Sequence, residues 1–148
     1  KYKKEKTKVE LKVKKLNPEA KLPQYAKPGD AGMDLFALEE TILSPGQFVG
    51  VATGIAMEIP EGYVGLVWDK SGLSIKHGLK TLGGVVDAGF RGEVKVGMIN
   101  LGSEEYKIEK GHKVAQMLIQ KVEQLEIIEA LELSETERGE GGFGSTGK

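Results

Sequence analysis

The segment 138–148 combines five glycines with one aromatic ring, one arginine and two hydroxyl side chains. So little apolar surface cannot build a core of its own, and a frayed chain end is one interpretation of it. The same residues also suit a nucleotide. Phe143 offers a face on which a base can stack, Arg138 offers a two-pronged donor for phosphate oxygens, and the glycines leave backbone N–H groups unshielded. The composition therefore predicts a segment that wraps a bound nucleotide.

Two aspartates lie in glycine-rich segments and could serve a hydrolytic reaction. Segment 83–92 is typical of a β-hairpin, and a carboxylate held in such a turn, here Asp87, can accept a proton from an attacking water. Asp34 follows Ala-Gly-Met and could orient a hydrated Mg²⁺, which usually takes only one or two carboxylates and keeps several waters. The alternative for each is a turn aspartate that hydrogen-bonds its own backbone.

Three consecutive residues, 70–72, are suited to bind an anion. Lys70 supplies a cation, Ser71 a hydroxyl, and Gly72 an unshielded backbone at the start of a short predicted helix, where free N–H groups meet the positive end of the helix dipole. A simple N-cap at Ser71 is the alternative. Gln116 alternates with apolar neighbours, a pattern that by itself indicates a strand residue facing solvent.

The elements that must position these residues are mostly strands. Turn residues recur about every 8–12 positions with little helical periodicity, which is typical of an all-β barrel or sandwich. One short helix is predicted over 73–77, with Ser71 as its cap and Gly78 just beyond its end. Trp68 and Phe48 are expected in the core. Strands are expected over 9–14, 32–37, 48–59 (one bent strand or two), 63–68, 94–99, 113–122 and 125–133.

Composition limits the classes of protein that fit. A chain of 148 residues fits one domain, and its net charge of −1 gives no electrostatic case for a nucleic-acid or membrane partner. No apolar run approaches the roughly 20 residues that span a bilayer. The lack of Cys excludes disulfides and suits a reducing compartment, so a cytoplasmic protein is expected. Only Arg91 and Arg138 are arginines among 21 basic residues, which hints that both positions need guanidinium geometry.

Five segments, taken in order, resemble the five motifs of the trimeric dUTP diphosphatase (dUTPase) family: 31–37, 69–79, 84–93, 111–116 and 138–147. The resemblance implies a distorted jelly-roll-like β-barrel or sandwich with one short helix, in which 1–137 form the β domain and 138–148 a flexible lid. It also implies a homotrimer in which each site takes the first, second and fourth motifs from one subunit, the hairpin from a second and the tail from a third. The implied reaction is dUTP + H₂O → dUMP + diphosphate with Mg²⁺.

The family's roles carry over to residues of the matching motifs. The resemblance implies that Asp87 activates the attacking water and that Asp34 holds waters of the Mg²⁺. The implied phosphate-binding residues are Lys70, Ser71, Gly72, Gln116, Arg138, Ser145 and Thr146. Uracil and deoxyribose would be bound by backbone groups around Gly84 and Val85, by Phe90 under the sugar, and by Phe143 stacked on the base. Cleavage of dUTP would limit uracil incorporation into DNA and supply dUMP for dTMP synthesis.

Three positions depart from the family's pattern. Lys70 stands where Arg is usual, which keeps the charge but loses the planar fork. Phe90 stands where Tyr is usual, so the ring face that rejects a ribose remains while the hydroxyl is lost. Val86 stands where Ile is common, a change of one methylene that a core tolerates. Activity is expected to survive all three changes.

Two alternatives stay open at this point. The related dCTP deaminase family has a catalytic Glu and an additional Arg at the positions that hold Gly97 and Ile75 here, so the acid–base group for deamination is missing. A non-catalytic nucleotide-binding regulator on the same scaffold would be expected to lack Asp87 or the tail, and both are present.

Overall fold

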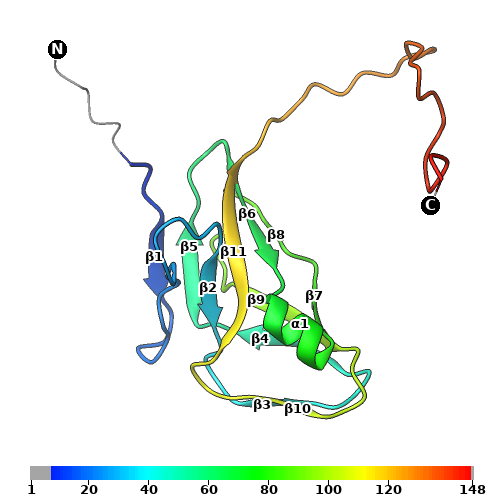
Figure 1. The fold of residues 1–148 in the computed structure, drawn as a ribbon. Coiled ribbons are helices and arrows are strands. Elements are labelled where there is room, and N and C mark those ends of the chain that lie inside the picture. The colour runs from blue at the N-terminus through cyan, green and yellow to red at the C-terminus, as the bar shows by residue number, and fades with distance from the viewer. Residues whose placement is uncertain (1–7, 148) are drawn as a thin grey trace.

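The computed structural model describes residues 8–147, so residues 1–7 of the predicted β domain and Lys148 of the predicted lid lie outside it. The elements in chain order are β1 (Lys12–Lys15), β2 (Met33–Phe36), β3 (Thr41–Leu43), β4 (Phe48–Ala52), β5 (Ile55–Glu58), β6 (Tyr63–Trp68), α1 (Ser71–His77), β7 (Leu79–Leu82), β8 (Val85–Val86), β9 (Lys95–Asn100), β10 (Tyr106–Ile108) and β11 (Lys113–Lys121). The prediction of a β fold with one short helix is confirmed (Figure 1).

Within residues 8–147 the strands form four small antiparallel sheets and not one closed barrel. The largest has the order β2-β11-β6-β8, the next has β4-β9-β7, and two-stranded sheets join β1 to β5 and β10 to β3. Strands far apart in sequence are neighbours, as where the long β11 lies between β2 and β6 (Figure 1). The predicted jelly-roll-like architecture is confirmed in this open form, and its crossing connections bring distant segments to the same sheet.

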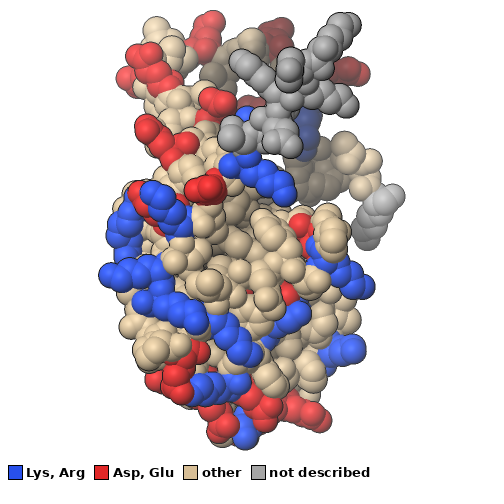
Figure 2. All heavy atoms as spheres, turned by 90° about the vertical axis from the view of Figure 1, so that its left-hand side faces the viewer, with Lys and Arg blue, Asp and Glu red and all other residues tan. Residues whose placement is uncertain are grey.

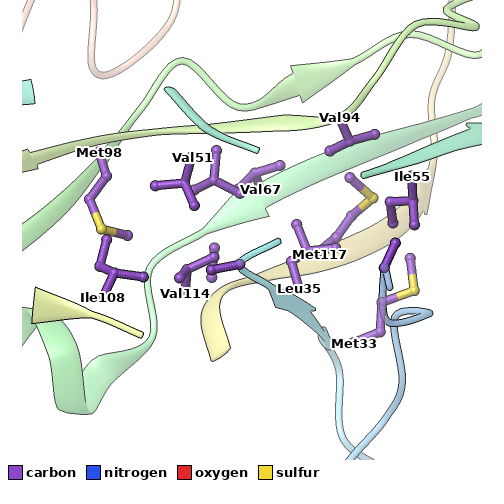
Figure 3. Packing of buried hydrophobic residues seen from close by; sticks show 14 of the residues in the cluster. Met33, Leu35, Val51, Ile55, Val67, Val94, Met98, Ile108, Val114 and Met117 are labelled. Carbon is purple, nitrogen blue, oxygen red and sulfur yellow. The ribbon is translucent and has the colours of Figure 1, made fainter. Parts of the chain in front are cut away.

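The core lies between these sheets and is built from alternate strand residues. In β9, for example, Val96, Met98 and Asn100 are buried while their neighbours are less so. Figure 3 shows labelled apolar side chains from several strands converging, among them Met33 and Met117, which are cross-strand partners. Burial of each such side chain contributes about 1.5–3 kcal/mol, and this packing holds the site's supporting strands in register.

The predicted core positions of two aromatic residues were wrong. Phe48 is 72% exposed and Trp68 is 53% exposed. Strand register explains both, because Val51 in β4 and Val67 in β6 take the inward positions and leave the aromatic residues on the outer face. Both rings are therefore surface features of the single chain.

Two local predictions also need correction. Lys70, not Ser71, is the N-cap of α1; it makes no side-chain capping bond, and Ser71 is the first helical residue. Gly78 ends the helix in the left-handed conformation at φ 69°, as predicted. Segment 125–133 forms no strand in the described chain, because no neighbouring strand is there for it to pair with.

Candidate active site

The first half of the site lies where β2, β11 and β6 meet the start of α1. Gln116 of β11 is in register with Asp34 of β2 on one side and with Trp68 of β6 on the other. The chain then runs from β6 through Asp69 and Lys70 into the helix. Strand pairing thus brings the first, second and fourth motif segments together, as the resemblance implied for one subunit.

Asp34 is a buried carboxylate held between two lysines. It is 2% exposed, Lys70 Nζ donates to its Oδ1 at 2.5 Å, and Lys113 Nζ lies 2.9 Å from its Oδ2. The Lys113 contact is an ion pair without hydrogen-bonding geometry, so Oδ2 is buried with no hydrogen bond. Burial raises the pKa of Asp34, but the hydrogen bond from Lys70 and the charges of Lys70 and Lys113 outweigh it and bring the pKa below its usual value. Asp34 is therefore ionised at neutral pH.

Sequence reasoning missed Lys113, although it lies in the fourth motif segment. Its contact with Asp34 depends on the pairing of β11 with β2, whose register shifts between Lys113 and Ala115. No spacing in the sequence reveals such a shift. Two cations, and not one, therefore stand beside the buried carboxylate.

Asp69, also missed, fastens the start of α1 to two strands. Its carboxylate accepts from the Thr81 N–H at 2.6 Å and from Lys80 Nζ at 2.9 Å, and its carbonyl accepts from Gln116 Nε2 at 2.9 Å. Burial raises the pKa of Asp69, while the bonds from Lys80 and Thr81 outweigh burial and bring the pKa below its usual value. Asp69 orients the groups around it, and both of its carboxylate oxygens accept hydrogen bonds from the protein itself.

The side chain of Gln116 packs closely against Gly32. A Cβ on Gly32 would lie 2.5 Å from Gln116 Oε1, so a larger residue at this point of the first motif segment would displace the Gln116 side chain. One amide hydrogen of Gln116 is used by Asp69, which leaves the second for a ligand. Close packing against Gln116 thus explains why a glycine stands at position 32, shortly before Asp34.

The start of α1 is open to an anion. Ser71 and Gly72 are exposed, and the first turn contains no acidic residue. A hollow of about 590 Å³ is lined here by Ala31, Asp69, Ser71 and Gln116, among others. The ammonium of Lys70 has three hydrogens and uses one on Asp34, so it can also donate to a ligand oxygen. Ser71 and Gln116 thus line one hollow, and Lys70 directly precedes Ser71 in the chain.

The second half of the site is the turn that carries Asp87. The Phe90 N–H donates to the Asp87 carbonyl at 3.1 Å and closes the turn, while β8 pairs with β6 and not with β9. The predicted hairpin is therefore wrong in its pairing, because each arm joins a different sheet. Gly84 has φ +122°, and a Cβ on it would lie 2.7 Å from the Val67 carbonyl oxygen, so β8 approaches β6 only through glycine.

Four predicted residues share a second hollow. Gly84, Val85, Asp87 and Phe90 all line a space of about 300 Å³. This hollow has no lining residue in common with the one at the start of α1. Since β8 runs antiparallel to β6, Asp87 lies toward the beginning of β6, whereas Lys70 follows its end. Within one chain the two halves of the site are separate.

The tail reaches neither hollow. Figure 1 shows it extending far from the sheets, and Phe143 is fully exposed with φ 49°. Arg138 Nε donates to the Gly141 carbonyl at 2.7 Å, a bond within the tail itself. Ser145 and Thr146 are exposed as well. The structure therefore does not bring these four predicted site residues to the rest of the site.

No cage for a metal ion is present in residues 8–147, in the sense of three or more His, Asp or Glu side chains placed around one point. The residues do fit a hydrated ion that arrives with a triphosphate, because Asp34 is ionised and its Oδ2 lacks a hydrogen bond.

The single described helix has seven residues, too few to cross a bilayer.

Acid should weaken the fold through Asp34 and Asp69. Their folded-state pKa values lie below the unfolded value of about 3.9, so both stabilise the fold above that pH and lose this contribution as pH falls through the lower folded pKa. We expect the thermal midpoint to drop steeply below about pH 4, and less steeply in Asp69→Asn, as measured by circular dichroism. The control Glu40→Gln breaks an exposed ion pair with Lys107 and should follow the unmodified chain; equal slopes for all three proteins would contradict this account.

Comparison with known proteins places the chain in one family. Residues 18–147 match the profile of the family described as dUTPase. A Clostridium kluyveri protein named deoxyuridine 5′-triphosphate nucleotidohydrolase is 52% identical over 141 residues, covering 94% of this chain and 99% of that protein. A Nautilia profundicola protein of the same name is 48% identical over 142 residues, covering 95% and 100%.

Solved structures agree with this placement. A mutant dUTPase of Staphylococcus bacteriophage 80alpha, with dUpNHpp, has a TM-score of 0.90 at 32% identity and covers 95% of this chain and 100% of its own. A mutant dUTPase of phage phi11 of S. aureus, whose structure concerns the coordination of a structural Mg(II) ion, has a TM-score of 0.79 at 29% identity and covers 84% and 98%.

The chain belongs to the dUTPase family, since fold, motif segments and near full-length relatives agree. It is accordingly an enzyme, a dUTP diphosphatase. Gly97 lies within β9 and has no side chain for the deaminase's acid–base role, so the deaminase alternative is set aside together with the non-catalytic regulator.

Proposed function

We propose that the enzyme cleaves dUTP between the α- and β-phosphorus atoms, with Asp87 as general base, at sites assembled from three copies of the chain. One observation carries the proposal: Ser71 and Gln116 line the hollow at the start of α1, the proposed phosphate-binding surface, whereas Asp87 lines a separate hollow of the same chain. A second copy that brings its turn against the phosphate-binding surface would complete the site.

The chemistry follows from the groups on each half. Asp87 accepts a proton from a water whose oxygen attacks the α-phosphorus in line. The bond from that phosphorus to the bridging oxygen breaks, and diphosphate leaves with the bridging oxygen, so that dUMP remains. Lys70, Ser71 and Gln116 bind non-bridging phosphate oxygens, as do backbone N–H groups at Gly72. Bound Mg²⁺ would neutralise part of the triphosphate charge, and Asp34 would accept hydrogen bonds from its waters on Oδ2.

The hollow at the turn suits the nucleoside. Its size, about 300 Å³, and its glycine and valine lining favour a flat pyrimidine, with backbone groups around Gly84 and Val85 toward the uracil edge. Phe90 in the same hollow would pack under the deoxyribose and leave no room for a 2′-hydroxyl. Phe143 would stack on the base when the tail closes, with Arg138, Ser145 and Thr146 on phosphate oxygens.

The segment that links β11 to the tail supports assembly from several copies. Residues 123–137 include six glutamates and no Lys or Arg, and the apolar side chains of Leu125, Ile127 and Leu131 are almost wholly exposed. Figure 2 shows basic side chains spread over the middle of the body on the side of β1. An acidic, apolar arm with nothing to pair with among the described residues of its own chain suits the basic side chains on the β1 side of another copy, where 125–133 would form the expected strand.

Shared sites predict complementation between two defective chains. Asp87→Asn lacks the base, and a chain truncated after Glu137 lacks the lid. If turn and lid reach each site from different subunits, trimers reassembled from equal amounts of the two chains should regain about a quarter of the active sites. Diphosphate release after co-refolding measures this, with each variant refolded alone as the control. A failure to regain activity in confirmed mixed trimers would show that one copy supplies both parts.

The test of the reaction is diphosphate release with Mg²⁺ from dUTP, dCTP, dTTP and UTP, with products separated by chromatography. Release from dUTP alone, giving dUMP, is expected, and it would show that Phe90 without the usual hydroxyl excludes ribose. Conversion of dCTP would restore the deaminase alternative, and no reaction with any of the four would favour a binding protein. In the cytoplasm the reaction would limit uracil in DNA and supply dUMP for dTMP synthesis.

A further inference from the structure

Arg91, the arginine that the proposed mechanism does not use, holds the turn that carries Asp87. Its Nη1 donates to the Ala88 carbonyl at 2.6 Å and to the Phe90 carbonyl at 3.2 Å. Its Nη2 donates to Glu58 Oε1 at 3.5 Å, at the end of β5. One side chain therefore connects two carbonyls of the turn to a strand in another sheet.

The turn has few other restraints among the described residues. β8 contains only two residues, and the Phe90 N–H to Asp87 carbonyl bond is the one backbone hydrogen bond across 87–90. The Asp87 side chain is exposed and makes no hydrogen bond or ion pair in the described structure. The direction of the Asp87 side chain is therefore set by the backbone of the turn, and the hydrogen bonds of Arg91 hold that backbone in place.

The use of arginine at this point is informative because the chain otherwise uses lysine. Arg91 is one of two arginines among 21 basic residues. A guanidinium donates from several fixed N–H groups at once, whereas an ammonium on a flexible stem is a point charge. Gly92 adds a second restraint: a Cβ there would lie 2.7 Å from Phe90 Cζ, so the backbone packs directly against the ring.

We propose that Arg91, anchored on Glu58, is a positioning residue that sets Asp87 against the attacking water and Phe90 against the sugar. This inference rests on the proposed function, because it assigns no contact between Arg91 and substrate. Glu58 is exposed and its bond is long, so it contributes less than the two carbonyl bonds.

The experiment compares Arg91→Lys, Arg91→Ala and Glu58→Gln with the unmodified chain. The control Lys107→Gln breaks an exposed ion pair with Glu40, remote from the turn in sequence. Steady-state rates with dUTP and UTP give kcat, KM and sugar selectivity, and amide hydrogen exchange of a peptide spanning 84–94 reports order in the turn without substrate.

The expected result is a fall in kcat with little change in KM for dUTP. Since a misplacement of about 1 Å can cost roughly 100-fold, we expect about that loss in Arg91→Ala, about tenfold in Arg91→Lys and a few-fold in Glu58→Gln. Selectivity against UTP should weaken and exchange in 84–94 should speed up in the same order. The control should match the unmodified chain in every measurement.

Unchanged kcat and selectivity in a folded Arg91→Lys variant would overturn the inference, even if Arg91→Ala failed to fold. A loss of thermal stability with unchanged kcat would reduce Arg91 to a purely structural role and would also overturn it. If the unmodified chain released no diphosphate from dUTP, the proposed function itself would fail, and hydrogen exchange would still show whether Arg91 orders the turn.

Discussion

Replacing Asp87 by Asn is expected to abolish diphosphate release from dUTP while the nucleotide still binds. Asn has the shape of Asp but cannot accept a proton from water, and loss of a general base costs about 10²–10⁴-fold in rate. The fold should be unaffected, because in the described structure the Asp87 side chain is exposed and only its carbonyl makes a hydrogen bond. Single-turnover diphosphate release and calorimetric binding of dUpNHpp measure the two effects separately.

The chain offers a matched control for this substitution. Asp30 is also an exposed turn aspartate, and its Oδ2 accepts from the Lys27 N–H at 3.0 Å, the ordinary role that Asp87 could have had. Asp30→Asn should keep the rate of the unmodified chain. If Asp87→Asn kept more than about a tenth of the activity, a different group would have to be the base. Lost binding of dUpNHpp would instead assign Asp87 a role in binding.

The fold was predictable from the sequence where local chemistry decides it. Tyr63–Trp68 was predicted to the residue, because Pro60 and Gly62 mark the turn before an apolar run. Gly78 ends α1 as predicted, because an αL residue there favours glycine. The positions of Phe48 and Trp68 could not be predicted in this way, since which face of a strand is buried depends on register with strands far away in sequence.

The same distinction applies to the site. Resemblance to the family identified the motif segments, and pairing of β2, β11 and β6 shows that three of them meet. Lys113 and Asp69 were missed because their contacts, to Asp34 and to Lys80 and Thr81, cross between elements. The strand expected over 125–133 shows the opposite limit: the alternating pattern is present in the sequence, but no strand of the described chain pairs with this segment.

Truncation after Glu137 is expected to cripple catalysis and leave the fold intact. The tail's side chains are mostly exposed, and its hydrogen bonds in the described structure lie within residues 136–147, so its removal takes nothing from the core. The thermal midpoint should therefore stay unchanged. Catalysis should fall by about 100-fold or more, because stacking of one base contributes about 1–3 kcal/mol and closure also excludes water from the reacting phosphate.

Three further variants show which residues of the tail account for this loss of activity. A chain truncated after Thr146 keeps Arg138, Phe143 and both hydroxyls, and it should retain the full rate. Phe143→Ala should mainly weaken binding of the base, whereas Arg138→Ala should reduce the rate through the phosphates. Unchanged turnover after removal of 138–148 would refute a lid. A lower thermal midpoint would mean that the tail supports the assembled trimer, since within the described chain it touches nothing whose loss could destabilise the fold.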